Sequence, residues 1–256
     1  MQILLADAKT MRGEPLPLPE GLSLTEPAFG TEALALAQEM GSFPSQELQG
    51  ILGGSLKVNE ETWLRYRDFR VAERQAAILA YTGQAYRHLK ADSLGSEALL
   101  FAQKRLFITS FLYGLLRPLD GIAPYRMEHF VKLEASGGEP MNRFWRNRLT
   151  DFLLTCIKAD DGTLLQLSTE EFESLFDWKK IEAEAHVIKP YFYVRTKGAL
   201  KVQAVWAKSC RGAMLRQVLM GSLTRPEELK AFDYEGFRYA KGYGDEEHLY
   251  FIREGQ

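Results

Sequence analysis

Stretches typical of strands and of helices follow one another along this chain in an irregular order. Gln2–Ala6 is predicted to be a short buried strand, and Leu106–Phe111 a second strand rich in β-branched and aromatic residues. The longest predicted helix covers Met141–Lys158, where apolar residues recur on one broad stripe. Because these elements do not alternate as regular βαβ units, we predict an α+β fold with a mixed β-sheet flanked by helices.

The length of the chain fits one large domain or two small ones. Its 256 residues are 46% hydrophobic, which is ample for a packed core, and they contain no obvious linker or internal repeat. No apolar run is long enough to cross a membrane, and the first residues do not resemble a signal peptide, so we expect a cytoplasmic protein.

The charges are unevenly distributed. Removing the eight basic residues between Ala185 and Pro226 leaves the rest of the chain at −10, although the whole carries only −2. That stretch contains no Asp or Glu, and its basic residues are Lys189, Arg195, Lys197, Lys201, Lys208, Arg211, Arg216 and Arg225. Such segregation steers anionic partners, and nucleic acid is the commonest large one. A solvated basic surface without a partner is an equally open interpretation.

Within this stretch, Val187–Val194 and Lys201–Ala207 resemble two long strands, and a helix is predicted over Arg211–Gly221. Ser209 would cap that helix, and Gly212 would permit close approach of a backbone or ligand. Lys208 and Arg211 would then face the positive end of the helix dipole, which is unfavourable unless an anion is bound. We favour a phosphate there over structural ion pairs.

Cysteine and histidine patterns point away from metal or thiol chemistry. The two cysteines, Cys156 and Cys210, and the four histidines show no metal-ligand spacing, so we expect no metal and no cofactor. Cys210 lies beside two cations that could lower its pKa. A small residue packed in the core is the favoured interpretation.

A second candidate site is the segment Tyr113–Glu128, which is punctuated by glycine and proline. Arg117 and Arg126 can each bind a phosphate through two parallel hydrogen bonds. Asp120 and Glu128 either orient these arginines or hold a divalent metal for hydrolysis, and the sequence leaves both open. Lys9 and Thr10, just after the first strand, form a weaker third candidate.

These residues carry a family resemblance over nearly the whole chain. Lys9-Thr10, Tyr81-x-Gly83-x-x-Tyr86 and Phe144-Trp145 occur in the order and spacing of the YaaA family of bacterial peroxide-stress proteins. So do Leu112-Tyr-Gly-x-Leu-Arg-Pro-Leu-Asp120, Pro124-Tyr-Arg126 with Glu128, and Lys208-x-x-Arg-Gly212. The resemblance implies a single domain over residues 1–256 with a family-specific α+β fold, a positively charged cleft and a helix-hairpin-helix-like element. It also implies binding of double-stranded DNA and a role in limiting peroxide damage linked to intracellular iron.

Several positions depart from the family pattern. Ala6-Asp-Ala-Lys-Thr10 stands where the family usually has Ser-Pro-Ala-Lys-Thr, and Lys208-Ser-Cys-Arg-Gly212 where it has Lys-Lys-Ala-Arg-Gly. Phe111 replaces a glycine in Leu-Ser-Gly-Leu-Tyr-Gly, which puts a phosphate-contacting hairpin at this segment in doubt. Gln166–Phe172 departs from the usual Asn-Leu-Ala-Ser-x-Glu-Tyr.

Our first hypothesis is a cytoplasmic DNA-binding protein, acting as a monomer and without catalysis, with weak sequence preference. Its predicted nucleic-acid contacts are Lys9, Thr10, Arg117, Arg126, Lys208, Arg211, Gly212 and Arg216. Its predicted structural or orienting residues are Tyr113, Gly114, Asp120, Tyr125 and Glu128. A single phosphate site requires that Lys9, Arg117, Arg126, Lys208 and Arg211 line one concave surface. The alternative is an enzyme acting on a nucleic acid or nucleotide, with Asp120 and Glu128 as acid-base or metal residues.

Overall fold

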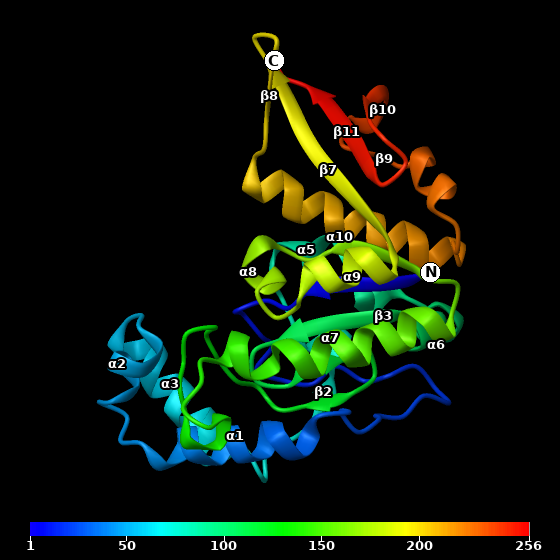
Figure 1. The fold of residues 1–256 in the computed structure, drawn as a ribbon. Coiled ribbons are helices and arrows are strands. Elements are labelled where there is room, and N and C mark those ends of the chain that lie inside the picture. The colour runs from blue at the N-terminus through cyan, green and yellow to red at the C-terminus, as the bar shows by residue number, and fades with distance from the viewer. Residues whose placement is uncertain (256) are drawn as a thin grey trace.

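The computed structural model of the protein describes residues 1–255, and one mixed β-sheet organises them (Figure 1). Its strand order is β4-β3-β1-β6-β7-β11-β10-β9, with β8 paired to the far end of β7. The strands are β1 (Gln2–Ala6), β3 (Leu106–Ser110), β4 (Gly114–Leu116), β6 (Thr163–Leu167), β7 (His186–Thr196), β8 (Ala199–Lys201), β9 (Asp233–Tyr234), β10 (Phe237–Gly244) and β11 (His248–Glu254). A separate ribbon pairs β2 (Gln75–Ala76) with β5 (Gly121–Ile122). The predicted mixed sheet is confirmed.

The centre of this sheet is parallel. β3, β1, β6, β7 and β11 run in one direction, and the antiparallel strands lie outside them. All five residues of β1 are buried, as expected of an apolar strand covered on both faces. The chain leaves β1 for β3 on one side and then returns to β6 on the other side. The carboxyl ends of β1 and β6 therefore form a topological switch point, where ligands of such sheets bind.

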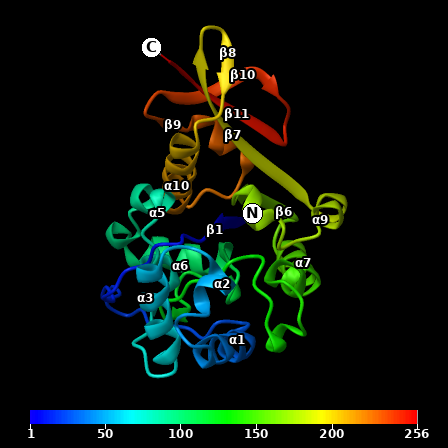
Figure 2. The same cartoon turned by 90° about the vertical axis from the view of Figure 1, so that its left-hand side faces the viewer.

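Helices flank the sheet in both views (Figures 1 and 2). They are α1 (Gly30–Ser42), α2 (Leu48–Leu52), α3 (Leu56–Arg67), α4 (Ala77–Ala80), α5 (Gln84–Leu89), α6 (Ser96–Arg105), α7 (Met141–Ala159), α8 (Glu170–Glu173), α9 (Trp178–Glu184) and α10 (Ala204–Gly221). Three short 3-10 helices are η1 (Ala91–Ser93), η2 (Glu134–Ser136) and η3 (Pro226–Ala231). Trp145 of α7 is fully buried and its indole donates to the carbonyl oxygen of Phe111 at 2.9 Å. Within residues 1–255, none of these helices has the length and apolarity needed to cross a membrane.

β7 joins two parts of the molecule. Its first residues pair with β6 in the body, and its remainder pairs with β11 in the upper part of Figure 1. Helix α10 follows β8 and lies between the upper strands and the body (Figure 1). Residues of α10 consequently reach the carboxyl ends of β1 and β6, which belong to the body.

The start of α10 corrects the sequence prediction. Lys201–Ala207 is not a strand, because β8 ends at Lys201 and α10 already begins at Ala204. The β-branched and aromatic residues here favour a strand locally, but packing of α10 against α5 overrides that preference. Ser209 therefore caps nothing, and Lys208 and Arg211 lie inside the helix instead of at its positive end.

Candidate functional site

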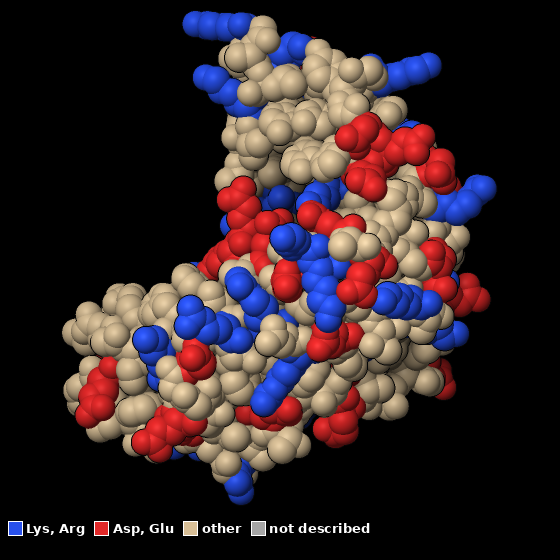
Figure 3. All heavy atoms as spheres, viewed as in Figure 1, with Lys and Arg blue, Asp and Glu red and all other residues tan. Residues whose placement is uncertain are grey.

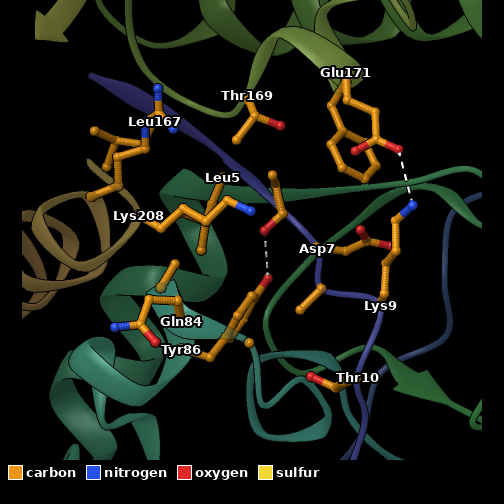
Figure 4. Close-up of a pocket in the computed structure, with 16 residues that line it drawn as sticks. Leu5, Asp7, Lys9, Thr10, Gln84, Tyr86, Leu167, Thr169, Glu171 and Lys208 are labelled. Carbon is orange, nitrogen blue, oxygen red and sulfur yellow. Dashed lines mark hydrogen bonds and ion pairs between the residues drawn. The ribbon is translucent and has the colours of Figure 1, made fainter. Parts of the chain in front are cut away.

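A pocket of about 280 Å³ opens at the carboxyl ends of β1 and β6 (Figure 4). Four segments that are distant in the sequence build it: the end of β1 with its following loop, the start of α5, the end of β6 with α8, and α10. The lining residues are Leu5–Thr10, Gly83–Tyr86, Leu167, Thr169, Glu171, Phe172, Lys208 and Arg211. The pocket therefore occupies the switch point of the sheet.

Two cations from α10 line this pocket and have no protein partner among residues 1–255. Lys208 and Arg211 are three positions apart, so both project from one side of the helix. Within residues 1–255, neither makes a side-chain hydrogen bond or an ion pair. Arg211 is half-buried, and burial lowers its pKa despite the opposing influence of Glu173 and Glu170. A partly desolvated guanidinium without a partner favours an anionic ligand.

The other two nearby cations are already paired, and of these only Lys9 lines the pocket, because Arg126 lies in an adjoining hollow beside Lys9. Lys9 Nζ donates to Glu128 Oε2 at 2.8 Å and lies 3.5 Å from Glu171 Oε1. Arg126 binds Oε1 of the same buried Glu128, through NH2 at 3.0 Å and Nε at 3.2 Å. Burial lowers the pKa of Lys9, but its two carboxylate partners outweigh burial and raise it. Glu128 thus braces Arg126 and neutralises Lys9.

Asp7 is a site residue that the sequence reasoning missed. It is half-buried on the Lys9 side of the pocket (Figure 4). Its Oδ2 accepts a 2.7 Å hydrogen bond from the hydroxyl of Tyr125, which also contacts Ser110 and Tyr81. Burial, reinforced by Glu171 and Glu128, raises the pKa of Asp7 to about 7, against the opposing influence of Tyr125 and Lys9. Its position directly after a buried strand was the available signal.

Arg117 does not join the pocket, so its predicted convergence with the other cations is wrong. It lies near the opposite, amino ends of β1 and β3, where it donates to Gln2 Oε1 and the Leu106 carbonyl oxygen, each at 3.3 Å. Its guanidinium lies 3.5 Å from the centre of the Phe107 ring. Asp120 is also committed to structure, because it accepts from Thr25 Oγ1 and from the Arg117 amide, both at 2.7 Å.

The structure places the three remaining predicted contact residues, Arg216, Gly212 and Thr10, in three different surroundings. Arg216 donates to the carbonyl oxygens of Leu89 and Lys90, both at 3.0 Å, at the end of α5. A Cβ placed on Gly212 would lie 1.9 Å from the Ala85 carbonyl oxygen, so this glycine permits the close packing of α10 on α5. Thr10 lines the exposed rim of the pocket.

The predicted orienting residues Tyr113 and Gly114 lie in the core. The Tyr113 hydroxyl accepts from Arg74 at 3.0 Å and from the Ala123 amide at 3.1 Å, and burial raises its pKa to about 12. Gly114 has φ +70° and closely approaches the ring of Trp145. Neither residue lines the pocket between β1 and β6.

The segment around Phe111, where the sequence put a phosphate-contacting hairpin in doubt, is the turn between the antiparallel strands β3 and β4. The Phe111 ring stacks on Phe172 at 4.6 Å between ring centres. The side chain thus supports the pocket wall from behind.

Cys210 is fully buried, and burial raises its pKa to about 12. The thiolate is therefore not populated near neutral pH, which agrees with the packing interpretation.

The surface is not uniformly basic. On the face drawn in Figure 3, basic and acidic side chains are interspersed, and acidic ones gather where the upper part meets the body. Three cations of the acid-free stretch find carboxylates elsewhere: Lys189 pairs with Glu182, Arg195 with Glu254 and Arg225 with Glu228. Of the eight, only Lys208 and Arg211 line the pocket.

Comparison with known proteins agrees with the resemblance. A family model described as peroxide stress protein YaaA matches residues 1–242. A UPF0246 protein of Phocaeicola vulgatus is 40% identical over 98% of both chains, and one of Bacteroides thetaiotaomicron is 39% identical over 98% of both. A UPF0246 protein of Acaryochloris marina is 31% identical over 99% of this chain and 100% of its own. The chain belongs to the YaaA family of peroxide stress proteins.

Proposed function

We propose that this protein binds DNA in the cytoplasmic response to peroxide, as a monomer. Lys208 and Arg211 would supply the central phosphate contacts, and Lys9 and Arg126 would flank them. The observation that carries this proposal is the half-buried Arg211, which has no partner within the described residues. Phosphate is an anion that a guanidinium binds through two parallel hydrogen bonds.

The family's helix-hairpin-helix-like element would be α2 and α3 with the turn between them. Gly53 and Gly54 form this turn with φ values of 65° and 87°, and Ser55 Oγ accepts from the Val58 amide at the start of α3. A Cβ on Gly54 would lie 2.8 Å from NH1 of Arg126, so the turn lies directly against a cation of the site. This adjacency supports one continuous binding surface that includes both the hairpin and the pocket rim.

The decisive variant combines Lys208→Ala with Arg211→Ala. We expect duplex affinity, measured by fluorescence anisotropy at low salt, to fall at least tenfold. The melting temperature should be unchanged or slightly higher, because neither cation has a protein partner to lose. Lys197→Ala with Lys201→Ala is the matched control, since it removes the same charge outside the pocket. Equal losses in both double variants would contradict a site at the pocket.

An enzyme acting on a nucleic acid or nucleotide is the second candidate, and Asp7 favours it more than Asp120 does. Asp120 is held by Thr25 and Arg117, and Glu128 is held by Lys9 and Arg126. Asp7, by contrast, lines the pocket with a pKa of about 7, which suits a proton-transferring group. Incubation of labelled DNA with and without magnesium, followed by gel electrophoresis, tests this. Turnover that survives Asp7→Asn would exclude the assignment.

A further inference from the structure

The size of the pocket limits which part of a DNA strand can enter it beside Arg211. A DNA duplex carries its phosphates on the outside of a wide double helix, whereas Arg211 lies half-buried in the wall of a pocket of about 280 Å³. Small-molecule sites typically begin near 300 Å³, so this pocket holds one small unit. The backbone of a DNA duplex can lie across the rim and contact the exposed Lys208 and the half-buried Arg211, but a base pair cannot enter the pocket beyond them. A single nucleotide that has left the base stack can enter.

The walls of the pocket suit the two ends of a nucleotide. Lys208 lies on the α10 side, whereas Glu171, Lys9 and Asp7 lie together on the opposite side (Figure 4). Glu171 would repel a phosphate, whereas Lys208 and Arg211 of α10 would attract it against the weaker opposing influence of Glu173 and Glu170. Between these ends, the lining is largely apolar and is formed by Leu5, Ala6, Ala8, Leu167 and Phe172.

We propose that this pocket binds one nucleotide unit, with its phosphate on Lys208 and Arg211 and its base directed toward Asp7. The inference rests on the proposed DNA binding when the nucleotide belongs to a DNA strand, as at a gap, a mismatch or a lesion. A free mononucleotide offers the same chemistry from a second source.

The polar groups near the base end are able to read a base edge. The Oδ1 of Asp7 and the Oγ1 of Thr169 make no hydrogen bond within residues 1–255, so both remain available to a ligand. A carboxyl group with a pKa of about 7 can donate in its protonated form and accept in its ionised form. Asp7 stands where the family usually has proline, so this base contact would distinguish this chain from relatives that follow that pattern.

The test uses duplex DNA with a single 2-aminopurine opposite a mismatch or facing a gap. This base fluoresces weakly when stacked and strongly when unstacked. We expect its fluorescence to rise several-fold when the protein binds. Thr169→Trp should abolish this rise, because it fills the pocket without removing any cation, while duplex affinity by anisotropy changes less than threefold. Thr169→Leu is a smaller filling variant, and Leu100→Trp on the exposed face of α6 controls for an added tryptophan.

A calorimetric titration with free nucleoside monophosphates and the corresponding nucleosides separates the two sources. The proposal expects tighter binding of the phosphorylated forms, by tenfold or more, and loss of binding in Thr169→Trp. If mononucleotides bind but the DNA signal does not rise, the source is the free nucleotide. Duplex binding with neither signal would overturn this inference and leave the proposed function intact. Absence of duplex binding would instead remove the proposed function.

Discussion

Glu128 offsets part of the positive charge near the pocket, because it pairs with two of the four cations there. It accepts hydrogen bonds from both Lys9 and Arg126, so these two residues and one carboxylate together carry a single positive charge. Lys208 and Arg211 are identical in formal charge but have no such partner within the described residues. Four cations that look equivalent in the sequence therefore differ in how strongly each can attract an anion.

Asp7 makes stability depend on pH in a predictable direction. An aspartate ordinarily releases its proton near pH 4, but the pKa of Asp7 in the folded protein is about 7. Between these values the folded state holds a proton that the unfolded chain has released. This contribution is fully present below pH 4 and is lost as the pH rises through 7.

The parent protein loses this contribution between pH 5 and pH 8, whereas Asp7→Asn has no carboxyl group to titrate. We therefore expect the free energy of unfolding of Asp7→Asn, relative to that of the parent, to rise by about 2 to 3 kcal/mol from pH 5 to pH 8. Urea denaturation at the two pH values measures this difference. Asp92→Asn, which changes an exposed carboxylate, should show no comparable change. A pH-independent difference for Asp7→Asn would contradict the raised pKa.

At the scale of elements, the contact between α5 and α10 sets the shape of the pocket, since both helices line it. Gly212 allows the closest approach, because its Cα faces the carbonyl oxygen of Ala85. Burial of an added methyl group there would require one helix backbone to move.

We expect Gly212→Ala to destabilise the protein by about 1 to 3 kcal/mol and to weaken DNA binding as well. Thermal and urea denaturation measure the first effect and anisotropy the second. Gly50→Ala is a matched control for the stability measurement, because a Cβ at that helical glycine meets open space. A stable Gly212→Ala protein would show that the two helices can separate without cost.

The sequence predicted the apolar strands and helix α7 well, since burial follows their periodicity. It failed at the start of α10. Val202, Val205 and Trp206 favour a strand locally, but β8 ends at Lys201 and packing on α5 makes the chain helical from Ala204 onward. It also could not place Arg117. The chain turns back after β3, so the antiparallel strand β4 carries Arg117 to the amino ends of β1 and β3, away from the pocket. Asp7 was missed because its pKa depends on Tyr125, Glu128 and Glu171, which only the fold brings near it.

At the scale of the whole molecule, a net charge of −2 offers no general attraction to DNA. Binding must then depend on the few cations near the pocket, and two of these, Lys9 and Arg126, are already paired with Glu128. If these cations neutralise about two to four phosphates, a plot of the logarithm of the binding constant against the logarithm of the salt concentration should have a slope of about −2 to −4. Titrations between 50 and 300 mM salt measure it. A slope steeper than about −6 would require a larger basic surface than the pocket and the hairpin provide.

β1 is the first strand of the chain and also lies in the interior of the sheet, between β3 and β6. During synthesis on the ribosome it emerges long before either neighbour exists. The walls of the pocket appear in the same order: the β1 loop first, β6 much later, and α10 last. A chain that stops before α10 thus carries every residue of the β1 loop but still lacks Lys208 and Arg211.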